Sequence, residues 1–341
     1  MRALERWLPR WLNLAPADAR PPAAVYISGS GVAVAKGVYR DGRFEVELRA
    51  DPIEALAESR DMLKRQSEDV GLRNTACNLV LAPEFYSVSL VEKPQVAEAD
   101  LKDAVRWQVQ ENVDFPVEQA TLDVFPLPDS ASRTRPMVFV VAMQTEFLKV
   151  LLSKVHEAGI EVSSVDISEL ALRNIVHGLF PEADQGVALL RLTAASGVIN
   201  ISRGDELFLS RRVSTLPSQY DAAVWDGLRE KLLLQVQRSI DYYESAMSQP
   251  PCNGCLVAAT HGWQDPVCDY LGEMLPVPIR PIRDELRNLF DIRLHNPEPV
   301  QIDWDQISVA QRNALSAALP ALGGLLRRLR DRSSGALEAA A

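Results

Sequence analysis

Cysteine is scarce in this chain of 341 residues, with only four copies. Four are too few for a disulfide framework at this length, which fits a reducing compartment. The potential zinc ligands are Cys252, Cys255, His261 and Cys268. The stretch 255–260 is predicted to be a strand, and at about 3.3 Å per residue it would separate Cys255 from His261 by about 20 Å. We therefore expect thiols beside a core strand and no metal site.

Long apolar runs are also missing. No stretch of about 18 apolar residues occurs, so no membrane-spanning helix is predicted. The longest uncharged stretch near an end, Asn313–Leu326, contains a proline and two glycines and is predicted to be a buried helix. The first residues lack the apolar core and cleavage site of a secretory signal, which predicts a cytoplasmic protein.

Positive charge is in deficit. The formal net charge is −10 and the pI is near 5.1, so the summed field repels nucleic-acid phosphates and anionic lipid at long range. We expect no nucleic-acid partner.

The segment 1–14 differs from the rest of this acidic chain. It has apolar side chains at helical spacing and arginines on another face, interrupted by Pro9. Peripheral membrane contact through this segment and packing against the chain's own body both stay open.

Recognisable catalytic motifs are absent. The four histidines are scattered without an H-x-x-x-H or H-E-x-x-H partner, and no G-x-S-x-G occurs. The acidic residues near position 115 are expected to form a solvated face, because nothing predicts burial of a carboxylate pair. No catalytic residue and no metal ligand is expected.

The order of predicted elements repeats once along the chain. At this length two domains are the default. The first half has strands at 23–28, 31–39 and 43–49, a helix at 52–69, a strand at 77–81, and later a helix, a strand and a helix at 145–158, 161–166 and 168–180. The second half has strands at 186–194, 197–202 and 206–214, a helix at 220–247, a strand at 255–260 and a helix at 265–275. A duplicated β-β-β-α-β-α unit builds the actin-like, or ribonuclease H-like, α/β architecture, with a cleft between its halves.

Two sequence stretches resemble a known family. Leu101–Phe125, LKDAVRWQVQENVDFPVEQATLDVF, predicts an amphipathic helix that Asp100 caps and Pro116 ends. It resembles the inserted subdomain of PilM-type actin-like proteins, and a second match to the same family lies at Leu232–Ser245, LLLQVQRSIDYYES. The wording is nearest to the family member that serves the mannose-sensitive haemagglutinin (MSHA) type IV pilus.

The resemblance spans about Ala23–Arg330 and implies a division of the chain. The expected parts are an amphipathic segment and linker at 1–22; a first actin-like domain at 23–86 and 145–184, completed by a C-terminal helix at 306–330; an inserted subdomain at 87–144; a second actin-like domain at 185–305; and a tail at 331–341.

Carboxylates are missing where the resemblance would place them. Actin-like ATPases use an Asp in each of two phosphate-binding hairpins to position Mg²⁺ and water. No Asp or Glu occurs over 23–38 or 186–204, and the expected positions hold Tyr26 and Arg191. Hydrolysis of ATP therefore loses its electrostatic basis, and we expect a degenerate ATPase that needs no cofactor.

Two alternatives keep a role for nucleotide. A residual anion site could use the loop residues Gly29, Ser30, Gly31, Ser196, Gly197 and Gly262, with ATP bound but not turned over. Tight hairpin turns explain the same glycines and serines. An actin-like ATPase that slowly hydrolyses ATP in the cleft would need carboxylates from elsewhere, such as Asp166 or Asp241.

The resemblance also implies a function. It predicts a noncatalytic cytoplasmic scaffold of a type IV pilus or secretion assembly platform, associated with the inner membrane through its partners. The expected partners are the N-terminal cytoplasmic tail of a PilN-like membrane protein and other platform proteins. The family captures that tail in a groove of the first domain near the insert. Trp107, Phe115 and Pro116 are the candidate contacts, with core packing as their alternative role.

Overall fold

The first of two large sheets is built mainly from the N-terminal half. The computed structural model describes residues 22–40, 43–73, 75–132, 135–296 and 298–338. The seven-stranded sheet has the order β15-β14-β3-β2-β1-β4-β8. Its strands are β1 (Ala23–Ile27), β2 (Gly31–Arg40), β3 (Arg43–Pro52), β4 (Ala76–Leu81), β8 (Glu161–Ile167), β14 (Asp291–His295) and β15 (Pro299–Gln301). The first three strands pair antiparallel, whereas β4 and β8 continue the sheet in parallel.

The second sheet repeats this plan. Its order is β11-β10-β9-β12-β13, with antiparallel pairs on one side of β9 and parallel pairs on the other. The strands are β9 (Val187–Leu192), β10 (Gly197–Arg203), β11 (Glu206–Val213), β12 (Gly254–Ala259) and β13 (Ile279–Pro281). The expected duplication is confirmed, because both sheets share the strand order 3-2-1-4-5.

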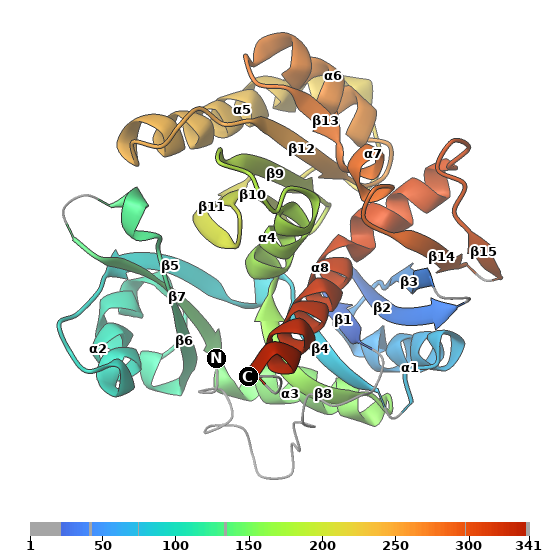
Figure 1. The fold of residues 1–341 in the computed structure, drawn as a ribbon, viewed down its shortest axis with the longest axis horizontal. Helices are drawn as coiled ribbons and strands as arrows, with labels where there is room; N and C mark the ends of the chain where they lie inside the picture. Colours follow the sequence, from blue (N-terminus) through green and yellow to red (C-terminus); the bar gives the residue numbers. More distant parts are fainter. Residues whose placement is uncertain (1–21, 41–42, 74, 133–134, 297, 339–341) are drawn as a thin grey trace.

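The helices pack between the two sheets and on the outer face of each sheet (Figure 1). α4 (Ser168–Leu179) and α8 (Val309–Glu338) share one core with the facing surfaces of both sheets. α1 (Ser59–Val70) and α3 (Thr145–Glu157) cover the other face of the first sheet, and α5 (Ala222–Asp241) and α6 (Gln264–Met274) cover that of the second. The short α7 (Ile282–Leu286) precedes the return of the chain to the first sheet. The alternate residues of each central strand therefore serve two different cores.

The inserted subdomain is a small layer of its own, at the left of Figure 1. Its strands are β5 (Ser87–Glu92), β6 (Ala120–Pro126) and β7 (Met137–Gln144), in the order β5-β7-β6. The prediction of one continuous helix here is wrong. α2 (Leu101–Arg106) is followed by a 3₁₀ segment, Trp107–Asn112. Arg106 donates to the carbonyls of Val117 and Ala120, at 2.8 and 3.0 Å, which ties this tighter turn to the start of β6.

Several predicted boundaries need correction. The helix expected from position 52 begins at Ser59, because β3 continues to Pro52 beside the first hairpin. The helix expected over 220–247 changes to a π-helical turn at Tyr242–Ala246. The expected C-terminal helix at 306–330 starts at Val309 and runs to Glu338, into the expected tail. The segments 1–14 and 1–22 lie outside the described residues, apart from residue 22.

The strands β14 and β15 correct the domain division. They fall within the range 185–305 expected for the second domain, yet β14 pairs in parallel with β3 of the first sheet. Both strands are short and β15 is fully exposed, so the sequence gives no strong strand pattern. A polar network explains why β14 joins this edge.

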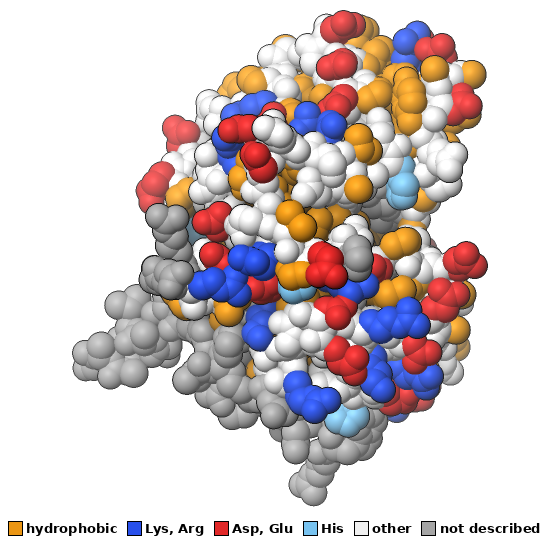
Figure 2. Space-filling model, turned by 90° about the vertical axis from the view of Figure 1, so that its right-hand side faces the viewer, with side chains coloured by type: hydrophobic (Ala, Val, Ile, Leu, Met, Phe, Trp, Pro, Cys, Tyr) orange, Lys and Arg blue, Asp and Glu red, His pale blue; other side chains and the backbone are white. Residues whose placement is uncertain are grey.

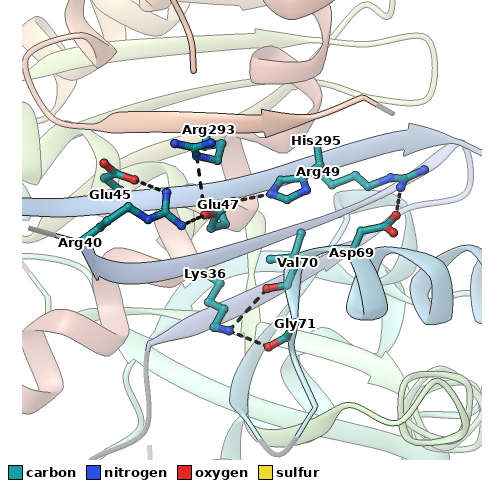
Figure 3. A network of polar contacts seen from close by, with 10 residues as sticks. All are labelled: Lys36, Arg40, Glu45, Glu47, Arg49, Asp69, Val70, Gly71, Arg293 and His295. Atoms are coloured by element: carbon teal, nitrogen blue, oxygen red, sulfur yellow. Dashed lines mark hydrogen bonds and ion pairs between the residues drawn. The ribbon is translucent and has the colours of Figure 1, made fainter. Parts of the chain in front are cut away.

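Glu47 of β3 is the centre of that network (Figure 3). It is buried and accepts hydrogen bonds from Arg40 of β2, at 2.9 Å, and from His295 of β14, while Arg293 of β14 lies 3.9 Å away. Burial alone would raise the pKa of Glu47, but the hydrogen bonds and charges of His295 and Arg40 outweigh it, so the pKa lies below the ordinary 4.5. The carboxylate therefore fastens the second half's last strands to the first sheet.

Glu47→Gln should lower the free energy of unfolding by about 2 kcal/mol at pH 7, because a buried charge-assisted network loses its anion. The folded-state pKa is depressed, so this stabilisation is complete above the unfolded value near 4.5 and is lost as the pH falls through the folded pKa. Urea unfolding of both proteins from pH 3 to 8 measures the difference. Glu45→Gln on the same strand, which removes one ion pair to Arg40, is the control and should cost less than about 1 kcal/mol. A difference that stays constant below pH 4.5 would contradict this role.

Two consecutive glycines let α8 pack closely against α4, at Gly323, and against the first sheet, at Gly324. A Cβ on Gly323 would lie 2.0 Å from the backbone oxygen of Ala171, and one on Gly324 would lie 2.6 Å from Val80. Asn174 of α4 also donates to the Gly323 carbonyl, at 3.1 Å. This close approach confirms the expectation of a buried C-terminal helix that packs back onto the first domain. None of the described helices combines the length and apolar character that crossing a bilayer requires.

Gly323→Ala should destabilise the protein by about 3 kcal/mol, because the added methyl group collides with backbone atoms that cannot rotate away. Thermal or urea unfolding measures the change. Gly227→Ala in α5 is the matched control: its Cβ would meet no atom within 4 Å, and the substitution should stabilise by up to about 1 kcal/mol. Equal stability of the two variants would show that α4 and α8 have room to separate.

Candidate functional site

A cavity of about 490 Å³ lies between the two halves, beside the hairpin turns β1–β2 and β9–β10. We call it the hairpin cavity. Its wall includes β1 and β9 residues, the turn residues of both hairpins and the N-terminal part of α8; the members used below are Tyr26, Ser30, Gly31, Asp51, Arg191, Thr193, Thr260, His261, Ala310 and Asn313. This is the cleft that the duplicated fold predicts.

The two residues that replace the expected acids meet across this cleft. The Arg191 guanidinium lies 5.2 Å from the centre of the Tyr26 ring and donates to its hydroxyl at 3.4 Å. It also donates to the Ala317 carbonyl of α8, at 3.3 Å. Both side chains are buried, so a cation and an aromatic ring close the cleft where a metal site would need anions.

Amides of the first hairpin turn are already used. The Gly29 amide donates to the Glu84 carboxylate at 2.9 Å, and the Ser30 amide lies 3.4 Å from the Ser28 hydroxyl. The Ser28 amide donates to the Gly31 carbonyl, at 2.9 Å. An incoming phosphate would have to displace the protein's own carboxylate from Gly29.

The second hairpin turn is closed in the same manner. Ser196 donates its amide to the Thr193 hydroxyl, and the Thr193 amide donates to the Ser196 carbonyl. A Cβ on Gly197 would lie 2.5 Å from the Ser214 carbonyl oxygen, so strand packing requires a glycine there. Gly262 has φ +79° in the turn after β12, next to His261, whose amide donates to Asn313 of α8. Turn geometry thus explains the predicted loop residues without a ligand.

Among the described residues that line the hairpin cavity, the one carboxylate comes from β3. Asp51 of β3 lines the cavity, which sequence reasoning missed because it lies beyond the hairpin. It accepts from Arg49 at 2.6 Å and from Gln66 at 2.8 Å. The alternative acids Asp166 and Asp241 do not line this cavity. The described residues contain no cluster of three or more His, Cys, Asp or Glu side chains able to hold a metal ion.

Three of the four cysteines lie in the core of the second half, whereas Cys77 is buried in β4 of the first sheet. Cys252 and Cys255 are buried and Cys268 is half-buried. Burial raises the thiol pKa of Cys252 to about 11 and of Cys268 to about 12, and it raises that of Cys255 as well. Burial therefore favours the neutral form of these thiols.

A second cavity, of about 220 Å³, lies between the inserted subdomain and the first domain. We call it the subdomain cavity. Its apolar wall comes from β6, β7, β8, α3 and α4 and includes Phe125, Val141, Leu148, Val165 and Leu170. Tyr86 also lines it, and its hydroxyl donates to the buried Glu169 carboxylate.

Charged groups border the same cavity. Asp166 of β8 is buried and pairs with Arg327 of α8 at 2.8 Å. Asp123 of β6 pairs with Lys102 at 2.7 Å. These pairs place fixed polar atoms at the rim of a mostly apolar hollow, which is the usual composition of a ligand pocket.

Two strand edges face this hollow. β6 is the last strand of the insert sheet and β8 is the last strand of the first sheet, so each has a strand neighbour on one side only. Both strands contribute lining residues. An extended peptide can therefore add to one edge while its side chains enter the apolar wall.

The predicted partner contacts lie elsewhere on the insert. Trp107 is 60% exposed on the 3₁₀ segment, Phe115 is half-buried against the insert core, and Pro116 is exposed. None of the three lines the subdomain cavity. The residues of the family-like stretch that do line it are at its end, Thr121, Asp123, Val124 and Phe125, and no periodic signal marked them as a site.

Comparisons with known proteins bear on the fold. No protein-family model matches the chain, and no curated protein matches its sequence. Among solved structures, the chain is similar to the PilM–PilN type IV pilus biogenesis complex, with 18% identity and a TM-score of 0.67 over 90% of this chain and 98% of that one. Together with the doubled strand order, this decides the architecture. The chain has an actin-like fold.

Two more distant structures are also similar to this actin-like chain. One is the cytoplasmic domain of EpsL, an inner-membrane component of the type II secretion system of Vibrio cholerae, with 13% identity, a TM-score of 0.46, and coverage of 86% of this chain and 93% of that one. The other is a Bacteroides thetaiotaomicron protein with an actin-like ATPase fold, with 8% identity, a TM-score of 0.49, and coverage of 76% and 90%.

One outer face can be seen in Figure 2, where the right-hand outline is notched between an upper and a lower part. Acidic and basic side chains are interspersed on it, and neither sign forms a large patch. The net charge of −10 is therefore not concentrated on this face.

The purified protein should release phosphate from ATP at the rate of a protein-free blank, with or without Mg²⁺, because Tyr26 and Arg191 stand where the resemblance would place the acids that direct the metal. A coupled phosphate assay measures this, with an active actin-like ATPase as the positive control. Release that requires Mg²⁺ and persists after repeated purification would restore the ATPase alternative.

Proposed function

We propose that this protein is a noncatalytic actin-like scaffold of a type IV pilus or secretion assembly platform. It would bind the N-terminal cytoplasmic tail of a PilN-like inner-membrane protein. The observation that carries the proposal is the subdomain cavity, an apolar hollow flanked by the free edges of β6 and β8. The similarity to a structure described as the PilM–PilN complex supports it at the level of the fold.

The chemistry of the hairpin cavity supports a role without turnover. Catalysis of phosphoryl transfer depends on fixed charges that complement the developing negative charge and its metal. Here the one lining carboxylate, Asp51, is engaged by Arg49 and Gln66. A protein with this cleft is better suited to hold other proteins in place.

We propose the MSHA pilus as its system, with an MshI-like role, on the wording of Leu101–Phe125 and Leu232–Ser245. The protein would work in the cytoplasm and reach the inner membrane through its PilN-like partner and other platform proteins. Contact of residues 1–14 with the membrane and contact of the partner with Trp107, Phe115 and Pro116 are separate proposals.

Leu170→Glu should weaken binding of the PilN-like tail at least tenfold, because it places a charge on the apolar wall of the subdomain cavity. Fluorescence anisotropy with a labelled synthetic tail peptide measures the affinity at low and moderate salt. Leu170 is partly exposed on α4, so the fold should tolerate the change.

Val150→Glu is the matched control for this experiment. Val150 is an apolar helical residue of the same domain, 48% exposed on α3, and does not line the cavity. It should leave peptide affinity within twofold of the original. Failure of the unmodified protein to bind the peptide would refute the PilN-like partner, and equal loss in both variants would refute the cavity as its site.

A further inference from the structure

Four Asp, Glu, Lys or Arg side chains are buried in the described part of the chain: Glu47, Asp166, Glu169 and Arg191. A buried charge is costly unless it is paired or neutralised. Glu47 pairs with Arg40 and Asp166 pairs with Arg327. Burial raises the pKa of Glu169, so a proton can relieve its charge.

Arg191 has neither a paired carboxylate among the described residues nor a way to become neutral. Its side chain is 2% exposed, and no carboxylate of the described residues lies within 4.0 Å of its guanidinium. A guanidinium cannot shed its proton at physiological pH. Its neighbours are the Tyr26 hydroxyl and ring and the Ala317 carbonyl, all uncharged, and its Nε is buried without a hydrogen-bond partner.

The position of this cation points to a ligand. Arg191 lines the hairpin cavity, whose volume of about 490 Å³ falls within the range of small-molecule sites. Hydroxyl and amide side chains line the same cavity, among them Ser30, Thr193, Thr260 and Asn313. Its carboxylate, Asp51, already has Arg49 as a counter-ion, so the unmatched charge of the wall is positive.

We propose that the hairpin cavity binds a small molecule through an anionic phosphate or carboxylate group on Arg191, without a divalent metal. The anion would supply the counter-charge that the protein lacks and accept hydrogen bonds from the guanidinium in a bidentate geometry. This mode differs from a metal-nucleotide site, in which carboxylates hold Mg²⁺ and hairpin amides hold the phosphates. It is independent of peptide binding in the subdomain cavity.

Calorimetric titration of the whole protein in low salt with EDTA tests this site. The probes are inorganic phosphate, ATP and citrate, with adenosine as the uncharged comparison. At least one anion should bind, with an affinity that 5 mM Mg²⁺ does not increase and that added salt weakens. Comparing phosphate and ATP with citrate distinguishes a phosphate-specific ligand from a carboxylate ligand.

Arg191→Met should lower the affinity for the anion that binds by ten- to a hundredfold, which is the loss expected when a charge-assisted hydrogen-bonding pair is removed. Arg191→Lys should retain part of the affinity. Arg211→Met is the matched control, because Arg211 also lies over a tyrosine ring, Tyr242 at 4.4 Å, and donates to a backbone carbonyl, but does not line the cavity. It should leave the affinity within twofold.

Ala310→Trp tests the cavity without touching the cation. Ala310 is an exposed lining residue at the start of α8, so the substitution fills space while the fold is retained. It should lower the affinity for the anion at least tenfold. The proposal is overturned if none of the three anions binds, if binding requires Mg²⁺, or if Arg191→Met and Ala310→Trp both bind as tightly as the original protein. Each of these results leaves peptide binding in the subdomain cavity unaffected.

Discussion

The contact between Arg191 and Tyr26 joins the two halves at the point where their central strands meet. One residue comes from β9 and the other from β1, which hold equivalent places in the repeated strand order. The guanidinium, the ring and the Ala317 carbonyl of α8 bridge the halves at this point, and the hairpin cavity lies beside them.

The inserted subdomain changes what the first domain can do. Without it, β8 would be an ordinary edge strand exposed to solvent. With β6 and β7 beside it, the same edge borders an apolar hollow whose rim is fixed by the pair of Asp166 and Arg327. The C-terminal helix therefore contributes both to the common core and to the border of the proposed peptide site.

Much of the fold could be predicted because the apolar residues of its strands and helices recur with a clear period. The central strands alternate between two cores, and the glycine turns between them mark the hairpins clearly. β13, β14 and β15 were missed because each has five residues or fewer and none is buried along its whole length. β14 is held to the first sheet partly by the contact of Glu47 with His295, which are far apart in sequence, so no local pattern reveals it.

The candidate site was predicted less completely, for a related reason. The absence of acids from both hairpins was visible in the sequence, and so was the substitution of Tyr26 and Arg191. That these two side chains touch, that Asp51 approaches from β3, and that Val165 and Leu170 line a second cavity all depend on tertiary packing. The motif suggested Trp107 and Phe115 as contacts, whereas Phe125 is among the residues of that stretch that line the subdomain cavity.

The return of the chain through β14 limits how the halves can move. α7 ends at Leu286 in the second half, and hydrogen bonding to β3 begins at Asp291. Only the segment 287–290 joins them, and its last residue, Phe290, is buried in the common core. A wide hinge opening would have to stretch this four-residue link or separate β14 from β3, so the connection restrains how far the cleft can open.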